Sequence, residues 1–460
     1  MSAPETAPAE VAPAEARGGE ALSRAQLRRR VLGLAAPVIG ENLLQTLLGV
    51  VDTILVAGLG AAALAGVGAA LQVIYIVTAA LTALSVGAAV LVAQAVGARQ
   101  LGEAGTVARQ ALVWSAIASA PLTALGLAFT GPIIALFGMA PDVAAIGEGY
   151  LGITMGSVAT IIIMLIAGGV MRGAGDSRTP MLVTLLANVV NVALAYALIY
   201  GHFGLPALGA LGSAWGTLVS RLIGAALLLW LLWRGVNGVG IAGRAGWRPR
   251  VATARGILDI GLPAALEEVV IITAIAALTP VVAALGTVSL AAHRVVINVL
   301  SLSFLPGIGF AMATTALVGQ SVGARRMDEA RAATSIALRW ALIWMGGLGA
   351  AFLLFAPQLV RIFTDDPQMI AIGALSVQVV ALTQPAWAGT FVFGGALRGT
   401  GDTRTPLVVS GTAMWVIAGL AFLATRIWPA LAAVWAAFLV IGPLEVYLLR
   451  RAWRRTSGGT

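Results

Sequence analysis

The chain has 460 residues, of which 59% are hydrophobic and 10% charged, and its formal net charge is +9. A soluble globular protein cannot cover so much apolar surface with so few polar groups, and a mean hydropathy of +0.96 points to a lipid environment. The absence of cysteine excludes disulfides and thiolate metal sites.

Residues 1–24 are rich in Ala, Pro and Glu and contain no apolar core of the kind that a signal peptide needs. We predict a disordered cytoplasmic tail there. About twelve apolar stretches follow, each near or above the roughly 20 residues that a membrane-spanning helix requires. They cover residues 32–58, 66–96, 108–131, 144–171, 180–201, 207–233, 256–284, 289–322, 334–356, 370–397, 405–425 and 428–449. The predicted fold class is therefore all-α integral membrane.

A polar gap with the sequence RGVNGVGIAGRAGWRPR divides these stretches into two sets of six. We predict an N-lobe over residues 25–233, a cytoplasmic linker over 234–252, a C-lobe over 253–450 and a cytoplasmic tail over 451–460. The Gly, Pro and Arg content of the gap favours irregular structure.

The two halves repeat one another in sequence. GGVMRGAGDSRTPM (168–181) recurs as GGALRGTGDTRTPL (394–407), and VAQAVGARQLGEA (92–104) recurs as VGQSVGARRMDEA (318–330). One register holds without a gap from residue 37 to 181, so each half is a copy of one duplicated unit. In an apolar chain, two such halves indicate a transporter with a pathway between them. We read the RGxGDxRTP segments as turns, in which the aspartate caps the following helix.

Every basic residue in the chain is an arginine, and the arginines gather in alternate loops. This is the positive-inside pattern, so we expect both termini in the cytoplasm. The basic loops recur at equivalent places, for example at Arg99 and Arg325, so both lobes face the same way. The lobes should then be related by a pseudo-twofold axis along the membrane normal. This placement also argues against nucleic acid as a partner.

No enzyme constellation is present. His202 and His293 lack an obvious carboxylate or serine partner in sequence, and there is no phosphate-binding loop and no metal-ligand cluster. We expect no enzyme activity, no metal site and no cofactor.

Ionisable residues within apolar spans carry the functional signal, because each costs about 3 kcal/mol at the bilayer centre. Glu41 and Asp52 lie on one face of the first span, together with Gln45. A carboxyl group that faces a cavity can load and release a proton near neutral pH. The alternative is a carboxyl that stays protonated and hydrogen-bonded within the bundle.

The seventh span carries Glu267 and Glu268, of which Glu267 is equivalent to Glu41. Neighbouring helical residues point about 100° apart, so only one of the two can easily face a central cavity. Position 278, which is equivalent to Asp52, is leucine. This asymmetry predicts that the N-lobe handles the coupling ion.

Further polar side chains occur in the fifth and sixth spans. Asn188, Asn191 and Thr217 can brace a carboxylate, coordinate a cation or simply bridge helices. Arg221, one turn after Thr217, either pairs with a carboxyl or extends to the membrane surface. Glu445 lies near a predicted span end, where we expect it to be solvated.

Several segments resemble the multidrug and toxic compound extrusion (MATE) family. They are VDTILVAGLGAAALAGVG (51–68), LAAHRVVINVLSLSFLPGIGFAMATTALVGQSVGA (290–324) and the repeated motifs above. The resemblance covers about residues 25 to 450. It implies two six-helix lobes around a central cavity, and antiport of drugs against protons or sodium ions.

Within this resemblance, Asp52 matches the coupling carboxylate of the first span, and Asn191 and Thr217 match polar residues of the fifth and sixth. Ala195 stands where the family's fifth-span Asp is expected, and residues 375–395 lack the acid of the NorM-like branch. The pattern is closest to the branch named after DNA-damage-inducible protein F. A sodium site that lacks a carboxylate binds its hard cation less well, which favours protons.

The predicted function is a secondary active antiporter that exports cationic or amphipathic small molecules in exchange for protons. Alternatives are a sodium-coupled drug antiporter and a lipid-linked precursor flippase, although basic cavity residues for the latter are few. Glu41, Gln45, Asn188, Glu267 and Glu268 are candidates for the substrate cavity. We expect a monomer in the bacterial cytoplasmic membrane, with the lipid bilayer as its surroundings.

Overall fold

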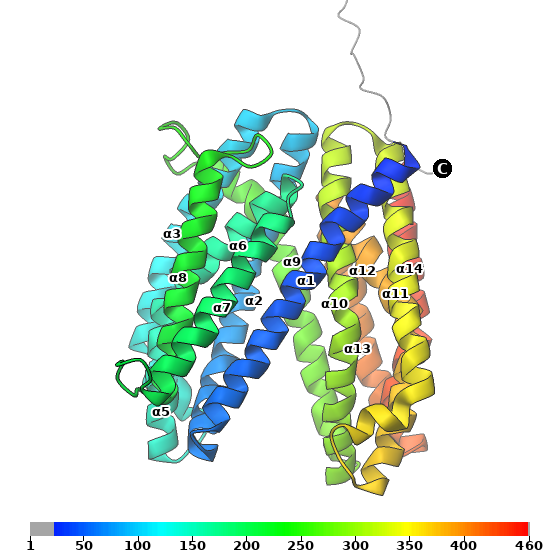
Figure 1. Cartoon of the computed structure of the whole chain (residues 1–460). Coiled ribbons are helices and arrows are strands. Elements are labelled where there is room, and N and C mark those ends of the chain that lie inside the picture. Colours follow the sequence, from blue (N-terminus) through cyan, green and yellow to red (C-terminus); the bar gives the residue numbers. More distant parts are fainter. Residues whose placement is uncertain (1–22, 459–460) are drawn as a thin grey trace, which may run out of the picture.

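The computed structural model describes residues 23–458, and this part of the chain consists of helices joined by loops (Figure 1). The longest of these loops covers residues 235–250, within the predicted linker. The predicted tail of residues 1–24 lies outside the described residues, apart from Ser23, which caps the first helix, and Arg24. The helices are α1 (Arg24–Ala57), α2 (Ala61–Gly97), α3 (Leu101–Ala128), α4 (Thr130–Ala135), α5 (Pro141–Gly156), α6 (Val158–Gly173), α7 (Arg178–Tyr200), α8 (Ala210–Arg234), α9 (Val251–Ala283), α10 (Thr287–Gly323), α11 (Met327–Arg361), α12 (Pro367–Thr400), α13 (Arg404–Ile427) and α14 (Leu431–Thr456).

Eleven of the described helices are long and apolar enough to cross a membrane, or twelve if the bent pair of α5 and α6 is counted as one span. The predicted all-α membrane fold is confirmed. The fourth predicted span, residues 144–171, is not one straight helix, because α5 and α6 meet at 49°. Ser157 lies at the break, and its hydroxyl donates to the carbonyl of Thr154. A side chain that bonds to the preceding turn in this way competes with the helical backbone.

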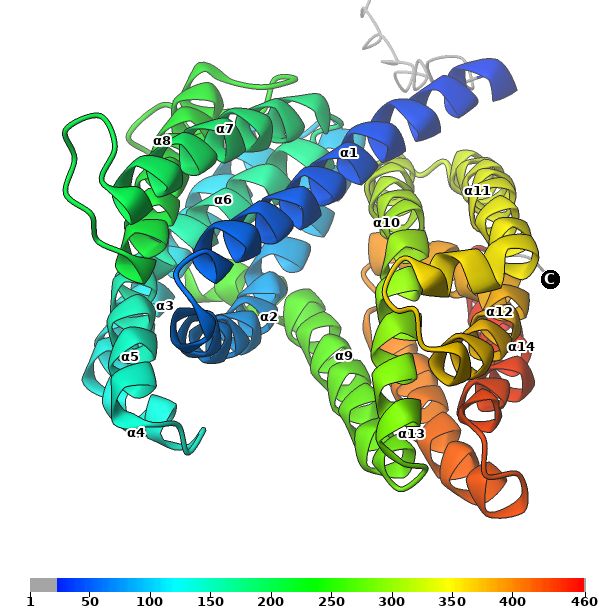
Figure 2. The same ribbon diagram turned by 60° about the horizontal axis from the view of Figure 1, so that its bottom comes forward.

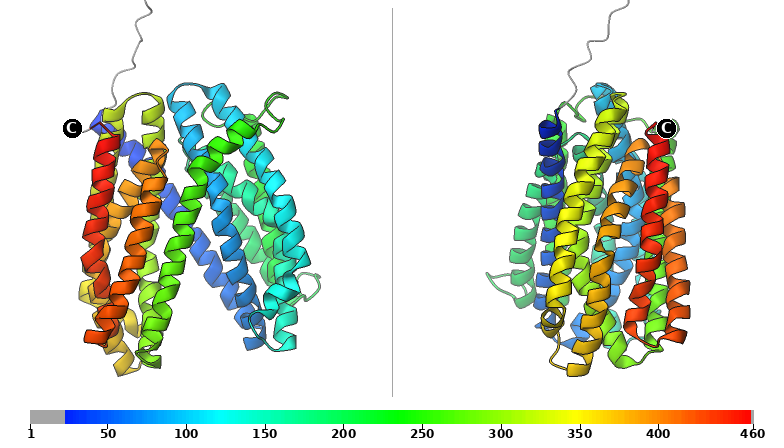
Figure 3. Two further views of the ribbon diagram at one scale, coloured as in Figure 1. Left: turned by 180° about the vertical axis from the view of Figure 1, so that it is seen from behind. Right: turned by 90° about the vertical axis from the view of Figure 1, so that its right-hand side faces the viewer.

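The helices form two lobes, α1–α8 and α9–α14, that stand side by side (Figure 3). Both copies break their third span at the same place. Phe129 separates α3 from α4 with a φ of −113°, and the equivalent Phe355 interrupts α11 with a φ of −111°. The duplicated sequence thus produces a duplicated backbone irregularity as well as duplicated helices.

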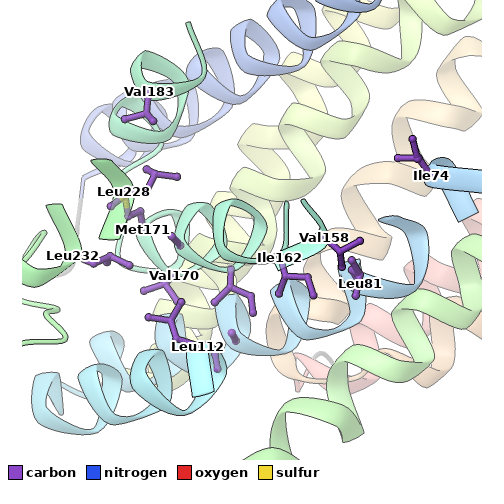
Figure 4. Packing of buried hydrophobic residues seen from close by; sticks show 14 of the residues in the cluster. Ile74, Leu81, Leu112, Val158, Ile162, Val170, Met171, Val183, Leu228 and Leu232 are labelled. Carbon is purple, nitrogen blue, oxygen red and sulfur yellow. The ribbon is translucent and has the colours of Figure 1, made fainter. Parts of the chain in front are cut away.

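Each lobe has its own apolar core. In the N-lobe, Leu112 of α3, Ile162 of α6 and Leu228 of α8 belong to one buried cluster (Figure 4). The C-lobe cluster includes Phe352 of α11 and Ile417 of α13. These cores pack the spans of each lobe into a unit and leave the lobe surfaces apolar, as a hydrocarbon solvent requires.

Helix α1 contacts both lobes. It runs obliquely across the molecule, and its beginning lies over α10 and α11 (Figures 1 and 2). Val31 and Leu34 in its first half share a buried cluster with Phe310 of α10 and Met345 of α11. Its second half packs against α7. Pro37 lies between the halves and removes a backbone hydrogen bond there. Movement between the lobes must therefore shift or bend α1.

The lobes approach each other at the end where α1 begins and α14 ends, and they diverge toward the opposite end (Figures 1 and 3). We call the first of these the closed end. There, a Cβ atom on Gly97 would lie 1.9 Å from the carbonyl oxygen of Gln320, and one on Gly323 would lie 1.8 Å from that of Gln94. Such close backbone contact is possible only for glycine.

Two glutamines reach across the closed end in the same symmetric manner. Nε2 of Gln94 donates to the carbonyl of Gly399 at 3.1 Å, and Nε2 of Gln320 donates to the carbonyl of Gly173 at 2.9 Å. Each acceptor lies at the end of a helix in the other lobe, where a helix leaves carbonyls without intrahelical partners. The closed end is thus joined by a symmetric pair of hydrogen bonds.

The two RGxGDxRTP segments form turns at this end. The carboxylate of Asp176 accepts the backbone N–H groups of Arg178 and Thr179, and that of Asp402 accepts the N–H of Thr405. The prediction that these aspartates cap the following helices is confirmed.

Candidate functional site

Asp52 lies in the second half of α1, near α7 and α8. Its carboxyl group is within electrostatic reach of the guanidinium of Arg221 on α8. Oδ1 of Asp52 and Nη1 of Arg221 are both buried, and neither has a hydrogen-bond partner among residues 23–458. Of the two roles left open for Arg221, a position near a carboxyl fits the structure better than extension to the membrane surface, but no ion pair joins Arg221 and Asp52.

Tyr150 of α5 is a third member of this group. Its hydroxyl lies beside the hydroxyls of Ser213 and Thr217 and within electrostatic reach of Asp52. The residue is 3% exposed. Tyr150 was not singled out from the sequence, although a tyrosine in the middle of an apolar span needs a polar partner for its hydroxyl.

Asn191 of α7 completes the group. It is fully buried, and its amide nitrogen donates to Oγ1 of Thr217 at 2.9 Å and to Oγ of Ser220 at 3.4 Å. Thr217 thus contacts both Asn191 and Tyr150. The structure therefore brings the predicted residues Asp52, Asn191 and Thr217 into one polar group, with Tyr150 as the link.

This polar group combines side chains of α1, α5, α7 and α8 around a single carboxyl. Hydroxyl groups both donate and accept hydrogen bonds, so they can serve an ionised and a protonated carboxyl alike. Arg221 supplies a positive charge that balances the ionised form. The arrangement is suited to a carboxyl that changes its protonation state within an apolar lobe.

Glu41 belongs to a different group. Its carboxylate forms an ion pair with Nη1 of Arg172 on α6 at 3.1 Å and accepts a hydrogen bond from Oγ1 of Thr184 at 3.5 Å. The side chains of the pair are only 11% and 13% exposed. The carboxylate of Glu41 is therefore bound to partners within the N-lobe, apart from the polar group around Asp52.

The other polar residues of this part of the N-lobe lie apart from both groups. Asn188 donates to the backbone carbonyl of Leu44 at 2.8 Å, so it bridges α7 to α1. Of the three roles that the sequence leaves open for Asn188, this contact is the bridging of two helices. Gln45 is exposed.

The C-lobe repeats the ion pair but not the aspartate group. Nη2 of Arg398 lies 2.7 Å from Oε1 of Glu267, and Glu267 is almost wholly buried. Glu268 is exposed, and its carboxyl also lies within electrostatic reach of Arg398. Leu278 occupies the position equivalent to Asp52 and is buried in the apolar core of the C-lobe.

The ion pairs of Arg172 and Arg398 are not among the sequence predictions, in which both arginines belong to turns. The signal was available: each arginine and its glutamate recur together in the register of the repeat.

One expectation about the C-lobe was wrong. Glu445, expected to be solvated at a span end, is 5% exposed and lies beside the hydroxyls of Ser410 and Thr390. The reason is that α14 continues to Thr456, well beyond the predicted span end at residue 449, so residue 445 lies inside the packed part of the helix.

Comparison with known proteins agrees with this architecture. The MatE family model matches residues 37–197 and again residues 263–423, so its second match begins 226 residues after the first. A probable multidrug resistance protein NorM of Thermotoga maritima is 33% identical over 395 residues, which cover 85% of this chain and 84% of that protein. A multidrug resistance protein NorM of Burkholderia vietnamiensis is 30% identical and covers 84% of each chain. A solved MOP superfamily transporter from Pyrococcus furiosus has the same fold, with a TM-score of 0.86 at 22% identity over 95% of this chain and 99% of its own.

Proposed function

Since the chain belongs to the MatE family, we propose that it is a secondary active efflux antiporter that exports cationic or amphipathic small molecules in exchange for protons. The multidrug-resistance names of its relatives from Thermotoga maritima and Burkholderia vietnamiensis support small-molecule drugs as the cargo. The observation that carries the coupling proposal is the buried group around Asp52, which joins a carboxyl, a guanidinium and several hydroxyls in only one of two duplicated lobes.

The proposed cycle begins with the termini in the cytoplasm, so that the divergent end opens outward. An external proton neutralises Asp52 and removes its electrostatic attraction to Arg221. Helix α1 then shifts against α8, and because α1 also packs on α10 and α11, the shift reaches the C-lobe. The change lowers the affinity for a cationic cargo, which leaves to the outside.

Sodium coupling has less support. Ala195, at the position where the resemblance expects an aspartate, is fully buried and packs against Gly216. Among residues 23–458, no three His, Cys, Asp or Glu side chains gather in a group that could hold a metal ion. Hard cations prefer several oxygen ligands, so the single Asp52 carboxyl suits a proton better.

A lipid-linked precursor flippase has less support as well. Such a protein needs basic side chains in its cavity to bind a pyrophosphate. Arg221 is placed beside Asp52 and Tyr150, and Arg294 is exposed on α10. Neither position favours a pyrophosphate cargo.

Ethidium export from vesicles tests the proposal, with proton and sodium gradients imposed separately. We expect the proton gradient alone to drive export by the wild type. Asp52→Asn should abolish this export, while Asp142→Asn, which neutralises an exposed aspartate at the start of α5, should retain it. Wild-type rates from Asp52→Asn, or export driven by sodium alone, would refute proton coupling through Asp52.

A further inference from the structure

A cavity of about 1130 Å³ lies at the closed end, between the two lobes. Its walls include the last turns of α2 and α10 and the turn before α7. The arginines that line it come from both lobes and are Arg30, Arg99, Arg178, Arg325 and Arg326. A second cavity of about 550 Å³ shares Gly33 and Arg178 with the first and adds Arg28 and Arg29. The two together form a basic chamber around the beginning of α1.

The acidic residues that line the larger cavity are already engaged. Asp176 accepts two backbone N–H groups and the hydroxyl of Thr179 at the start of α7. Glu329 is paired with Arg326 at 2.9 Å. In contrast, the four remaining arginines of the cavity are solvent-exposed and form no ion pair with any described residue. The positive-inside pattern explains why arginines lie at this end, but not why arginines of both lobes line one cavity.

The backbone at two of these arginines is unusual in the same way. Arg99 has a φ of +60° and the equivalent Arg325 has a φ of +57°. This left-handed conformation after a helix end is normally taken by glycine, since side chains with a Cβ rarely adopt it. Both copies of the duplicated unit therefore keep an arginine where glycine would be easier, directly at the cavity. Such strain, repeated at equivalent positions, points to a role for the side chain.

We propose that this chamber binds a phosphate-bearing anion, either the headgroup of an anionic phospholipid or a soluble phosphate compound. Guanidinium groups present planar pairs of N–H donors that match phosphate oxygens, and anionic lipids are concentrated at the cytoplasmic membrane surface. Because Arg99 and Arg178 belong to the N-lobe and Arg325 to the C-lobe, the site is complete only while the two lobes are in contact at this end. Binding therefore stabilises that conformation by linkage.

The test measures closure directly and does not depend on transport. The chain has no cysteine, so Glu103→Cys on α3 and Asp328→Cys on α11 accept a pair of fluorescent labels across the closed end. We expect nanodiscs that contain phosphatidylglycerol to increase energy transfer relative to pure phosphatidylcholine. Inorganic pyrophosphate added to phosphatidylcholine nanodiscs gives the second arm. Higher energy transfer with phosphatidylglycerol only identifies a lipid headgroup as the ligand, and higher energy transfer with pyrophosphate as well identifies a phosphate group from either source. Either result supports the site. Unchanged energy transfer in both arms overturns the proposal.

Variants separate the chamber from general surface charge. Arg99→Gly together with Arg325→Gly removes two charges but suits the left-handed backbone, so folding is preserved. We expect this double variant to weaken the apparent affinity for phosphatidylglycerol about 25-fold, since each basic side chain near an anionic surface contributes about fivefold. Arg450→Gln with Arg451→Gln removes two exposed charges of α14 at the same membrane face and should have little effect. Equal losses in both variants would show diffuse attraction only and overturn the proposal.

Discussion

Arg398 and Glu267 form a 2.7 Å ion pair in the C-lobe at the positions that Arg172 and Glu41 occupy in the N-lobe. In each lobe the ion pair joins the first helix to the helix that precedes the RGxGDxRTP turn, which are α1 and α6 in the N-lobe and α9 and α12 in the C-lobe. The duplicated unit therefore includes a buried electrostatic contact besides its helices and turns. Its acidic members were candidates for the cavity, and the structure ties both to partners inside their lobes.

Arg398→Ala should destabilise the protein strongly, because it leaves the carboxylate of Glu267 buried without its partner. Removing one member of a buried pair costs about 3 to 5 kcal/mol. The measurement is the midpoint of thermal unfolding in detergent. Arg172→Ala should have a smaller effect, since Glu41 is more exposed and keeps its contact with Thr184.

The double variant Arg398→Ala with Glu267→Gln is the control for this explanation. Because glutamine removes the buried charge and keeps the shape, the double variant should unfold at a higher temperature than Arg398→Ala alone. If the double variant and Arg398→Ala unfold at the same temperature, the arginine stabilises the lobe through packing of its side chain and not through its charge.

Tyr150→Phe should slow proton-driven export while leaving the fold intact. The substitution removes only the hydroxyl that lies beside Thr217 and near Asp52, so the phenyl ring still fills its place among α5 and α8. The loss of about 1 kcal/mol that one hydrogen bond contributes corresponds to an export rate about fivefold lower. Tyr196→Phe, at an exposed tyrosine of α7, is the matched control. Equal rates for the two variants would exclude a role for Tyr150 in coupling.

The sequence was sufficient to predict what depends on composition and repetition. Twelve spans, two lobes and the caps at Asp176 and Asp402 follow from apolar length, register and turn chemistry, which are local properties. The group around Asp52 was predicted only in part. Asn191 and Thr217 lie on helices next to each other in sequence, whereas Tyr150 joins them from a span that a break at Ser157 bends by 49°.

Contacts between distant segments cannot be predicted from a single span, and for the buried ion pairs the sequence signal is that each arginine and its glutamate recur together in both copies. The pairing of Arg172 with Glu41 joins residues 131 positions apart, and no periodicity within one span predicts which helix face meets which. The burial of Glu445 was mispredicted for a related reason. The polar residues after 449 are typical of a span end, but Leu449 and Trp453 are buried in an apolar cluster and α14 continues to Thr456.

Gly97→Ala should open the closed end. A Cβ atom at this position would lie 1.9 Å from the backbone oxygen of Gln320, and backbone cannot move aside as a flexible side chain can. The resulting steric clash would destabilise the closed conformation by about 1 to 3 kcal/mol. Energy transfer between labels at positions 103 and 328 should fall, and proton-driven export should fall with it. Gly68→Ala on the same helix meets no atom within 4 Å and should behave as wild type.

Gln94→Leu and Gln320→Leu test whether the symmetric hydrogen bonds hold the two lobes together. Each substitution removes one bond across the closed end, at 3.1 and 2.9 Å, so the two single variants should lower the closed population by similar amounts. Interhelical hydrogen bonds in membranes contribute about 0.6 kcal/mol each, so each variant should shift the equilibrium about threefold and the pair about ninefold. Gln72→Leu, which replaces an exposed glutamine of α2, is the control. The same energy transfer in all of these variants would mean that glycine packing alone keeps this end closed, since the glutamine bonds would then contribute nothing measurable.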